Sequence, residues 1–328
     1  MLQMHFVGDD IADRVSPGRR IMTGMENGAT ARTTPQDITD RVVASFDRAE
    51  TPRTREIMQS LVRHLHSFVA EVRLTQEEWQ AGIAALTATG QITDERRQEF
   101  ILWSDVLGVS MFVDALAHPV PAGATESTVI GPFYVPGSPL RDYGANIAEH
   151  ADGTPAWVHG RVLDALTGEP LAAAELDVWQ NGANRLYAVQ DPDAPERHLR
   201  GRFHTGDDGR YGFLAVRPVA YPIPDDGPVG SMLAETGRHP WRPAHIHMIA
   251  RADGYETLVT HVFDGDSDYL GSDTVFAVKP SLVHTFQERD LDDPDRPPGV
   301  EGEWCSLNCD LALVPGDADE VTDPNRTA

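Results

Sequence analysis

The chain has 328 residues, 41% of them hydrophobic, a size that permits one large domain or two smaller ones. Asp and Glu number 51 against 27 Lys and Arg, which gives a formal net charge of −24. This charge repels nucleic acid and anionic membrane surfaces. No apolar run is long enough to span a bilayer, and Cys305 and Cys309 are too few for a disulfide scaffold. We therefore predict a soluble, cytoplasmic protein with reduced thiols that binds neither nucleic acid nor membranes.

Residues 1–34 show no regular pattern and are predicted to form an irregular N-terminal extension. They lack the apolar core of a signal peptide. Met22 and Met25 are alternative initiators within this stretch.

Residues 35–120 are predicted to form a helical domain. Apolar positions follow helical spacing over 53–73, a second helix begins at Thr75 in a capping-box pattern, and a third begins near Asp94. The apolar faces of such helices need covering.

Residues 121–328 change to the pattern of an all-β sandwich, so the expected fold is mixed α and β, with the helical domain first. From Ala156 onward, short segments are separated by Gly, Pro, Asp and Asn. An acidic, proline-containing surface loop is expected over 288–303. The expected strands are 157–162, 210–216, 245–250, 258–263, 274–278 and 307–314.

The hexapeptide RPAHIH, residues 242–247, is the most informative stretch of the sandwich. On a strand, alternate side chains share one face, so His245 and His247 can converge on one metal ion, with the positive charge of Arg242 close by. The spacing alone fits equally well a pair of histidines in solvent or in a packed core.

A second pair with the same spacing, His64 and His66, lies in a helical pattern. Residues i and i+2 of a helix diverge by roughly 200°. We therefore expect this pair on a solvated helix face and assign the metal hypothesis to His245 and His247 alone.

Two tyrosines stand next to turn signals from which they could reach the same face. Tyr187 follows the alternating run 174–180 and a turn-like NGAN segment, and Tyr221 precedes the rigid, proline-rich stretch 222–228. Taken alone, each tyrosine is better explained by ordinary packing.

Other apparent motifs fail on physical grounds. Asp264–Asp268 imitates the start of a calcium loop, but Tyr269 replaces the required glycine and Val275 the acidic twelfth residue. An acidic turn after a strand is the better interpretation. No glycine-rich phosphate loop or nucleophile elbow occurs in a convincing context.

Taken together, these segments resemble the intradiol aromatic-ring dioxygenases. The matching segments occur in family order: ESTVIGPFY (126–134), DVWQ (177–180), LRGRF (199–203), YPIP (221–224) and GRHPWRPAHIH (237–247). Within the family, RLYAVQ (185–190) and GYETLVTHVF (254–263) are most similar to hydroxyquinol 1,2-dioxygenases. The resemblance implies one Fe3+ per chain, held by Tyr187, Tyr221, His245 and His247.

The resemblance also implies catalytic roles. Hard phenolate oxygens stabilise the ferric state, in contrast to the ligand triad of iron(II) oxygenases. Tyr221 would leave the iron as the diol binds and accept its proton. Arg242 would stabilise negative charge that develops on the ring and on oxygen. His261 stands near a position where related enzymes often carry glutamine, so hydrogen bonding to the site stays possible there.

A substrate pocket is expected around the aromatic ring. Asp105 interrupts an apolar helix, where an unpaired buried carboxylate would be costly, and a third ring hydroxyl would give it a partner. On sequence alone, Asp105 could equally cap a helix, bond backbone or face solvent. The pocket residues expected by local matching are Leu102, Asp105, Val129, Ile130, Gly131 and Pro132.

The leading hypothesis is cleavage of hydroxyquinol by O2 to 3-hydroxy-cis,cis-muconate and maleylacetate in the degradation of aromatic compounds. Catechol or chlorocatechol 1,2-dioxygenase activity, giving cis,cis-muconates, is the close alternative. A non-catalytic β-sandwich protein that binds phenol or lipid is the alternative from a different class. The resemblance further implies a homodimer through the N-terminal helices, which in the family can enclose bound lipid.

Overall fold

The computed structural model describes residues 32–94, 97–149, 151–195 and 197–317. The chain separates into two compact units, Met1–Trp79 and Gln80–Ala328. Almost all of the predicted N-terminal extension, including Met22 and Met25, lies outside the described residues.

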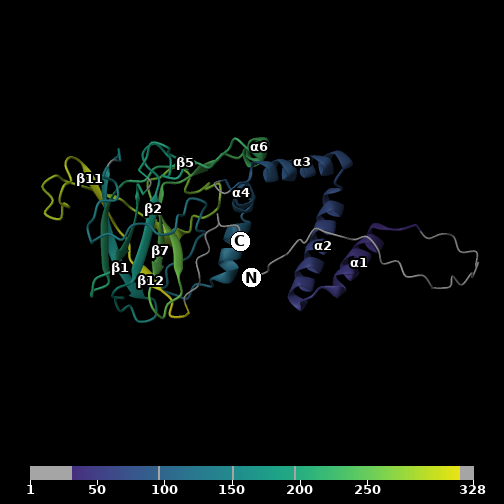
Figure 1. Cartoon of the computed structure of the whole chain (residues 1–328), viewed down its shortest axis with the longest axis horizontal. Coiled ribbons are helices and arrows are strands. Elements are labelled where there is room, and N and C mark those ends of the chain that lie inside the picture. Colours follow the sequence, from purple (N-terminus) through teal and green to yellow (C-terminus); the bar gives the residue numbers. More distant parts are fainter. Residues whose placement is uncertain (1–31, 95–96, 150, 196, 318–328) are drawn as a thin grey trace, which may run out of the picture. The chain divides into compact units, whose positions relative to one another are not determined.

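The first unit contains helices α1 (Pro35–Ser45) and α2 (Pro52–Val72), joined by the short helix η1 (Phe46–Arg48). The two long helices lie side by side (Figure 1). Thr34 begins α1 with a capping box, because its hydroxyl accepts the Asp37 N–H and the Asp37 carboxylate accepts the Thr34 N–H. Helix α2 confirms the helix predicted over 53–73, yet within this chain only Val62 of its 21 residues is buried.

Three further helices precede the strands: α3 (Gln76–Ile92), α4 (Glu99–Val106) and α5 (Val109–Ala117). The predicted capping box of α3 is confirmed, since Thr75 and Glu78 exchange side-chain and backbone hydrogen bonds of 2.8 and 3.2 Å. The predicted start of a helix near Asp94 is wrong by five residues. The Asp94 carboxylate instead accepts the Arg97 N–H at 2.7 Å, and α4 begins only at Glu99.

Among the described residues, no single helix is both long and apolar enough to cross a membrane. Helices α4 and α5, which meet at a bend of 74°, reach that length and apolarity only as a pair.

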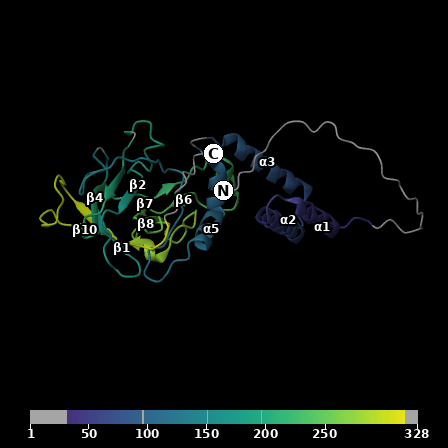
Figure 2. The ribbon, with the colours of Figure 1, turned by 60° about the horizontal axis from the view of Figure 1, so that its bottom comes forward.

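Two five-stranded sheets form the sandwich (Figures 1 and 2). The first has the order β10-β11-β1-β12, with β4 also paired to β1, and the second has the order β3-β2-β7-β8-β9. The strands of the first sheet are β1 (Pro155–Asp164), β4 (Arg210–Val216), β10 (Gln287–Arg289), β11 (Trp304–Asn308) and β12 (Leu311–Leu313). Those of the second are β2 (Glu175–Gln180), β3 (Arg200–His204), β7 (His245–Arg251), β8 (Leu258–Asp264) and β9 (Val283–His284).

Smaller elements connect the sheets at one end. Strands β5 (Tyr221–Pro222) and β6 (Trp241–Arg242) pair with each other, and helix α6 (Pro228–Glu235) lies between them in sequence. Proline at the first position starts α6, so the predicted rigid loop ends where this helix begins. The 3-10 helix η2 (Pro280–Leu282) precedes β9.

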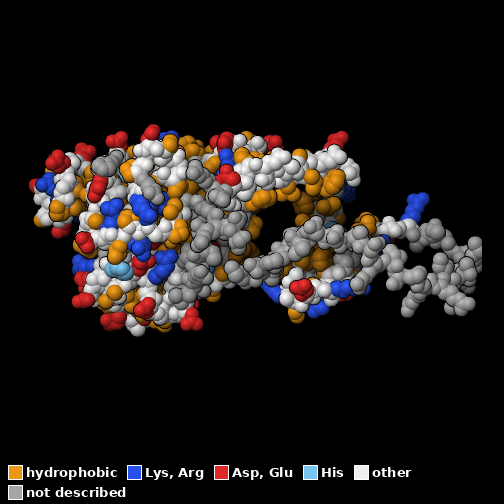
Figure 3. All heavy atoms as spheres, in the orientation of Figure 1, with side chains coloured by type: hydrophobic (Ala, Val, Ile, Leu, Met, Phe, Trp, Pro, Cys, Tyr) orange, Lys and Arg blue, Asp and Glu red, His pale blue; other side chains and the backbone are white. Residues whose placement is uncertain are grey.

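The core between the sheets is made of alternate residues from each strand. Ile246, Met248 and Ala250 of β7 pack with Val158 and Phe213 of the opposite sheet, and all are fully buried. Because side chains alternate along a strand, the intervening residues of β7 lie on the other face of the second sheet. Acidic side chains are dispersed over the surface of the sandwich (Figure 3), in keeping with the negative net charge.

Two strand predictions are corrected. Residues 274–278 do not form a strand, because the Asp273 carboxylate accepts the N–H groups of Val275 and Ala277 and Phe276 has a left-handed φ of 60°. The predicted strand 307–314 is divided between β11 and β12, both parallel to β1. The strand predicted over 210–216 is β4, and the acidic stretch after β8 forms the predicted turn.

Candidate metal centre

The outer face of the second sheet carries a buried cluster of polar aromatic side chains. His245 and His247 lie on β7, and His261 lies opposite His247 on the neighbouring strand β8. All three are at most 1% exposed, and one nitrogen of each lies within 4.8 Å of the others. The structure thus forms a histidine-rich group able to hold a metal ion, and the sheet register makes it rigid.

His245 has a defined orientation. Its Nδ1 lies 2.7 Å from the carbonyl oxygen of Pro243, and a carbonyl only accepts hydrogen bonds. Nδ1 therefore carries the proton, and Nε2 presents its lone pair to the cluster. Hydrogen bonding of the outer nitrogen to a carbonyl is the usual arrangement of a metal-ligating histidine.

Tyr187 and Tyr221 reach the same place from outside the sheet. The hydroxyl of Tyr187 lies 3.1 Å from His247 Nε2 and 3.4 Å from His245 Nε2. The ring of Tyr221 lies 5.3 Å from that of Tyr187 and 5.6 Å from that of His245, measured between centroids. Both tyrosines are almost completely buried. The structure therefore brings together all four residues predicted as ligands.

The spacing of these donor atoms fits a shared cation. His245 Nε2 and His247 Nε2 are 3.3 Å apart, and the Tyr187 hydroxyl completes a triangle with sides of 3.1 and 3.4 Å. Metal–ligand bonds of about 2.1 Å at angles of 90–110° place neighbouring donors roughly 3.0–3.5 Å apart. Three electron-rich atoms this close are best satisfied by a positive ion between them.

Burial controls the protonation of these groups. It lowers the pKa of both His245 and His247 well below the ordinary value, and the charge of Arg242 lowers it further. The imidazoles are thus neutral and available as ligands. Burial raises the pKa of Tyr187 well above its ordinary value, and Tyr221 adds to this. A phenolate at Tyr187 therefore requires a cation beside it.

Arg242 is a buried charge at the edge of the cluster, 3% exposed. Its Nη1 lies 3.4 Å from the Tyr221 hydroxyl and 3.3 Å from His245 Nε2. Burial alone would lower its pKa, but Asp273 and Tyr221 more than offset this and raise the pKa above its ordinary value. Arg242 thus supplies a permanent positive charge next to the candidate ligands.

His261 is the third histidine of the cluster. Its ring lies 4.1 Å from that of His247, and its Nδ1 makes a short hydrogen bond with the Thr128 hydroxyl. Its Nε2 is buried with no hydrogen-bond partner among the described residues. His261 can therefore act either as a neighbour of the ligands or as a ligand itself.

Two aromatic residues of the site were not assigned a role from the sequence. Trp179 stacks on the His247 ring at 4.6 Å and an interplanar angle of 12°, since β2 places it directly opposite that histidine. Phe133 stacks on Tyr187 at 4.6 Å. Both lie in quoted motifs, DVWQ and ESTVIGPFY, but only the sheet register and the path of the 126–140 segment show what they touch.

The predicted pocket residues lie around this cluster. A Cβ atom on Gly131, whose φ is 75°, would come within 3.2 Å of the His247 ring, so glycine allows the chain to approach the site. Ile130 packs with Tyr187 and Tyr221. Leu102 and Val129 pack in a cluster that contains Phe263, whose ring contacts His245. Pro132 is half-buried next to Gly131.

Asp105 on α4 is 6% exposed, so the solvent-facing alternative is excluded. Burial raises its pKa to about 6, while Ser110 and the charge of Arg242 act in the opposite direction. Asp105 is therefore a buried acid close enough to Arg242 for the two charges to interact. Its pKa of about 6 lies near neutral pH.

Comparisons with known proteins identify the family of this chain. Residues 51–125 match the family model "Catechol dioxygenase N terminus", and residues 129–302 match the model "Dioxygenase". Hydroxyquinol 1,2-dioxygenase of Rhodococcus opacus is 49% identical over 85% of this chain and 94% of its own length. The 6-chlorohydroxyquinol 1,2-dioxygenase of Cupriavidus pinatubonensis is 51% identical over 75% of this chain and 89% of its own.

The crystal structure of hydroxyquinol 1,2-dioxygenase from Pseudomonas putida DLL-E4 has the same fold, with a TM-score of 0.81 and 50% identity. The match covers 86% of this chain and 98% of that one. Its helical N-terminal part and β-sandwich agree with the fold predicted for this sequence. This chain belongs to the intradiol ring-cleavage dioxygenases, a family of metal-dependent enzymes.

Proposed function

We propose that this chain cleaves hydroxyquinol with O2 to 3-hydroxy-cis,cis-muconate, which tautomerises to maleylacetate. The observation that carries this substrate is the identity of about one half to relatives named for hydroxyquinol, over both the helical and the sandwich parts of the chain. The buried carboxylate of Asp105 near Arg242 adds chemical support, because hydroxyquinol has one more hydroxyl than catechol.

The metal in this proposal is Fe3+, one per chain, with Tyr187, Tyr221, His245 and His247 as its ligands. The donor spacing and the two phenol oxygens support this choice, since hard anionic oxygen favours the ferric ion. When bound, Fe3+ would chelate the adjacent hydroxyls of the substrate and activate the ring toward O2. Burial of Tyr187 makes its ionisation depend on the metal, so metal uptake releases a proton there.

Three residues carry the remaining chemistry. Tyr221, one of the four residues that would hold Fe3+, would accept the proton of a substrate hydroxyl as the diol binds. Arg242, whose Nη1 lies 3.4 Å from the Tyr221 hydroxyl, stabilises negative charge that develops on the ring and on oxygen. His261, held by Thr128, presents its Nε2 beside His247 and orients the groups around it.

The substrate lies against the residues that surround the cluster. Asp105 accepts a hydrogen bond from the third ring hydroxyl, which gives this buried carboxylate a further partner beside Ser110. The remaining pocket residues, Leu102, Val129, Ile130, Gly131 and Pro132, form the apolar wall and exclude water from the ring.

The chain organisation follows the same proposal. Residues 35–120 form a helical dimerisation domain after the extension 1–34, and residues 121–328 form the catalytic domain. The exposed apolar side chains of α2, among them Leu65, Phe68 and Val72, support a homodimer whose helices can bind lipid. The free, buried thiols of Cys305 and Cys309 are compatible with a cytoplasmic location.

Oxygen uptake tests the function directly. Iron-loaded protein, prepared anaerobically, is given hydroxyquinol, catechol and 4-chlorocatechol in parallel, with a control without enzyme because hydroxyquinol autoxidises. We expect uptake above the control, fastest with hydroxyquinol. Preference for a catechol would overturn the substrate but keep the reaction, and no uptake with any of the three would contradict the dioxygenase activity.

A further inference from the structure

Asp273 is a buried carboxylate in the loop between β8 and η2, 4% exposed. Its Oδ1 accepts hydrogen bonds from Arg242 Nε at 3.2 Å and the Val275 N–H at 3.3 Å. Its Oδ2 accepts from Arg242 Nη2 at 3.4 Å and the Ala277 N–H at 3.0 Å. All four contacts are hydrogen bonds from N–H donors, so each oxygen of the carboxylate accepts two of them.

These contacts fix the guanidinium of Arg242. A carboxylate that receives Nε and Nη2 holds the planar fork in one orientation. The remaining nitrogen, Nη1, then points at the Tyr221 hydroxyl and His245 Nε2, 3.4 and 3.3 Å away. Among the described residues, Asp273 makes no hydrogen bond with either Tyr221 or His245, so it reaches these two residues through Arg242.

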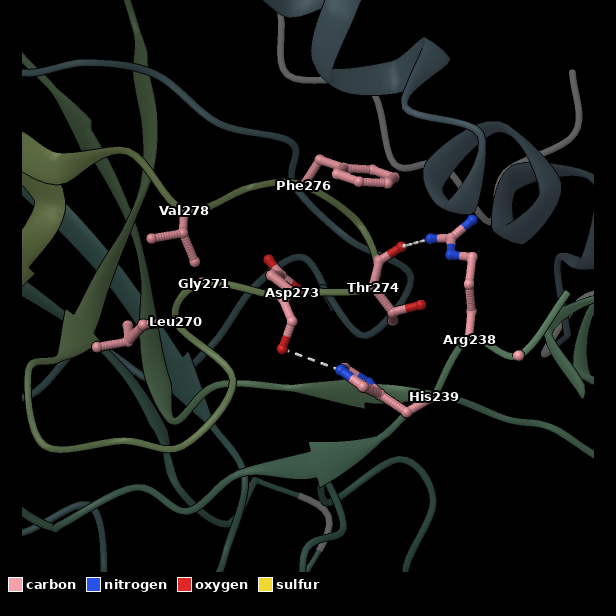
Figure 4. Close-up of a pocket in the computed structure, with 10 residues that line it drawn as sticks. Arg238, His239, Leu270, Gly271, Asp273, Thr274, Phe276 and Val278 are labelled. Carbon is pink, nitrogen blue, oxygen red and sulfur yellow. Dashed lines mark hydrogen bonds between the residues drawn. The ribbon is translucent and has the colours of Figure 1, made fainter.

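The loop that carries Asp273 borders a cavity of about 460 Å³ on one side (Figure 4), and polar contacts hold it there in addition to the buried side chains of Val275 and Ala277. Across this cavity, Arg238 donates to the carbonyl oxygens of Thr274 and Val106 at 2.8 and 2.7 Å. His239 is 2.9 Å from the Ser272 hydroxyl. The Thr274 N–H donates to the Trp241 carbonyl, next to Arg242.

We propose that Asp273 is a positioning residue that holds the Arg242 fork so that a single N–H group, Nη1, faces the reacting atoms. This inference rests on the proposed function, in which Arg242 stabilises charge on the substrate. Without Asp273, the guanidinium could rotate about its last bonds, and the Nη1 contact would be lost for part of the time. A displacement of about 1 Å at such a contact is enough to slow a reaction by roughly 100-fold.

A purely structural role is the competing explanation, since Asp273 also holds the N–H groups of its own loop. The chain offers a matched control. Asp264 on β8 is also 4% exposed, binds Arg217 through both oxygens at 2.6 and 2.9 Å, and accepts the Asp266 N–H. Strand alternation places Asp264 on the face opposite His261 and Phe263.

The test compares Asp273→Asn, Arg242→Gln, the double variant and Asp264→Asn in the iron-loaded full-length protein. Steady-state kcat and KM for hydroxyquinol are measured together with the absorption spectrum of bound 4-nitrocatechol and the melting temperature. We expect Asp273→Asn to lower kcat by roughly 10- to 100-fold, the range for residues that orient a metal site from outside, and to shift the spectrum. The double variant should be no slower than Arg242→Gln, because the fork that Asp273 holds is already gone.

Asp264→Asn should lower the melting temperature comparably but leave kcat and the spectrum close to wild type. Unchanged kcat in Asp273→Asn, losses that multiply in the double variant, or an equal loss of kcat in Asp264→Asn would each overturn the proposal. If Asp273→Asn does not fold, Asp273→Glu keeps the charge but moves the carboxylate by one methylene, and a wild-type rate there would overturn it.

Failure of the proposed function is recognised separately, because wild-type protein would then show no uptake with hydroxyquinol or catechol. In that case a crystal structure of Asp273→Asn decides the inference. Displacement of Arg242 Nη1 from Tyr221 and His245 supports it, and an unchanged Arg242 overturns it.

Discussion

The two His-x-His pairs of this chain have the same spacing but lie in different surroundings. His64 and His66 lie on α2, where His64 is exposed and His66 is half-buried and bonded to Thr39 of α1. The expectation of a solvated face is therefore right for His64 and wrong for His66. His245 and His247 lie on β7, both 1% exposed, with their Nε2 atoms 3.3 Å apart. The same spacing thus leaves one histidine exposed and the other half-buried on the helix, whereas on the strand it brings both together in a buried cluster.

The secondary structure thus determines whether two histidines in a His-x-His sequence can bind the same metal ion. A helix turns residues i and i+2 away from each other, whereas a strand places them on one face. The sheet then adds neighbours that a helix does not have, since β2 brings Trp179 and β8 brings His261 opposite His247.

The largest expected effect comes from removing a histidine of the strand pair. In His245→Ala or His247→Ala we expect loss of bound iron and a fall in kcat of more than about 100-fold, because changes outside the ligand shell alone cost roughly 10- to 100-fold. His64→Ala and His66→Ala are the matched controls and should keep iron and activity. Metal analysis and oxygen uptake check this, and full iron occupancy in His247→Ala would refute the strand-based site.

The two tyrosines are a second difference, because the unit that contains the helix pair has no tyrosine in its sequence. Tyr221→Phe removes the group that accepts the substrate proton, so we expect kcat to fall by roughly 10²- to 10⁴-fold. The iron-loaded variant should keep a visible charge-transfer absorption, because Tyr187 can still bind Fe3+ as a phenolate. The exposed Tyr143 provides the control, Tyr143→Phe, with unchanged rates. A wild-type rate in Tyr221→Phe would show that another group accepts the proton.

Asp105 tests whether the site is specific for a third hydroxyl. We expect Asp105→Asn to lower kcat/KM for hydroxyquinol by about 10- to 100-fold, the value of a hydrogen bond to a charged group, and to change catechol cleavage much less. Parallel kinetics with both substrates measure this. Equal losses for the two substrates would remove Asp105 from the specificity of the enzyme.

The smallest effect concerns stability. Burial raises the pKa of Asp105 to about 6 in the folded protein, from an ordinary value of 3.8. The folded state thus holds this proton more tightly than the unfolded state, and its stability falls as pH rises from about 4 to 6. Metal-free Asp105→Asn should become more stable relative to wild type across this range, by up to about 3 kcal/mol. Thermal unfolding at pH 4–8 checks this, and a difference independent of pH would contradict the buried, titrating acid.

Local patterns predicted much of the fold but not the contacts between distant segments. Short segments separated by Gly, Pro, Asp and Asn identified β4, β7 and β8, and the capping box at Thr75 identified the start of α3. The segment 274–278 resembles a strand because four of its five side chains are apolar, but Asp273 just before it accepts the N–H groups of Val275 and Ala277 in a local turn that this apolar pattern does not reveal.

The same limit applies to the site. His245 and His247 could be predicted because two residues of one strand form the motif. Tyr187 and Tyr221 were assigned as ligands only from the family resemblance. Tyr187 and His247 are 60 positions apart in the sequence, and no short-range rule predicts the distance of 3.1 Å between the Tyr187 hydroxyl and His247 Nε2. Trp179, Phe133 and Asp273 were missed because their roles depend on the register of β2 and on the path of two loops.

The most direct test of the account is a crystal structure of the iron-loaded protein with anomalous diffraction at the iron edge. The account predicts one peak per chain within bonding distance of Tyr187, Tyr221, His245 and His247, with His261 beside the ligands. A peak held instead by His245, His247 and His261, with both tyrosine hydroxyls away from the metal, would contradict the two-tyrosine, two-histidine centre on which the proposed chemistry depends.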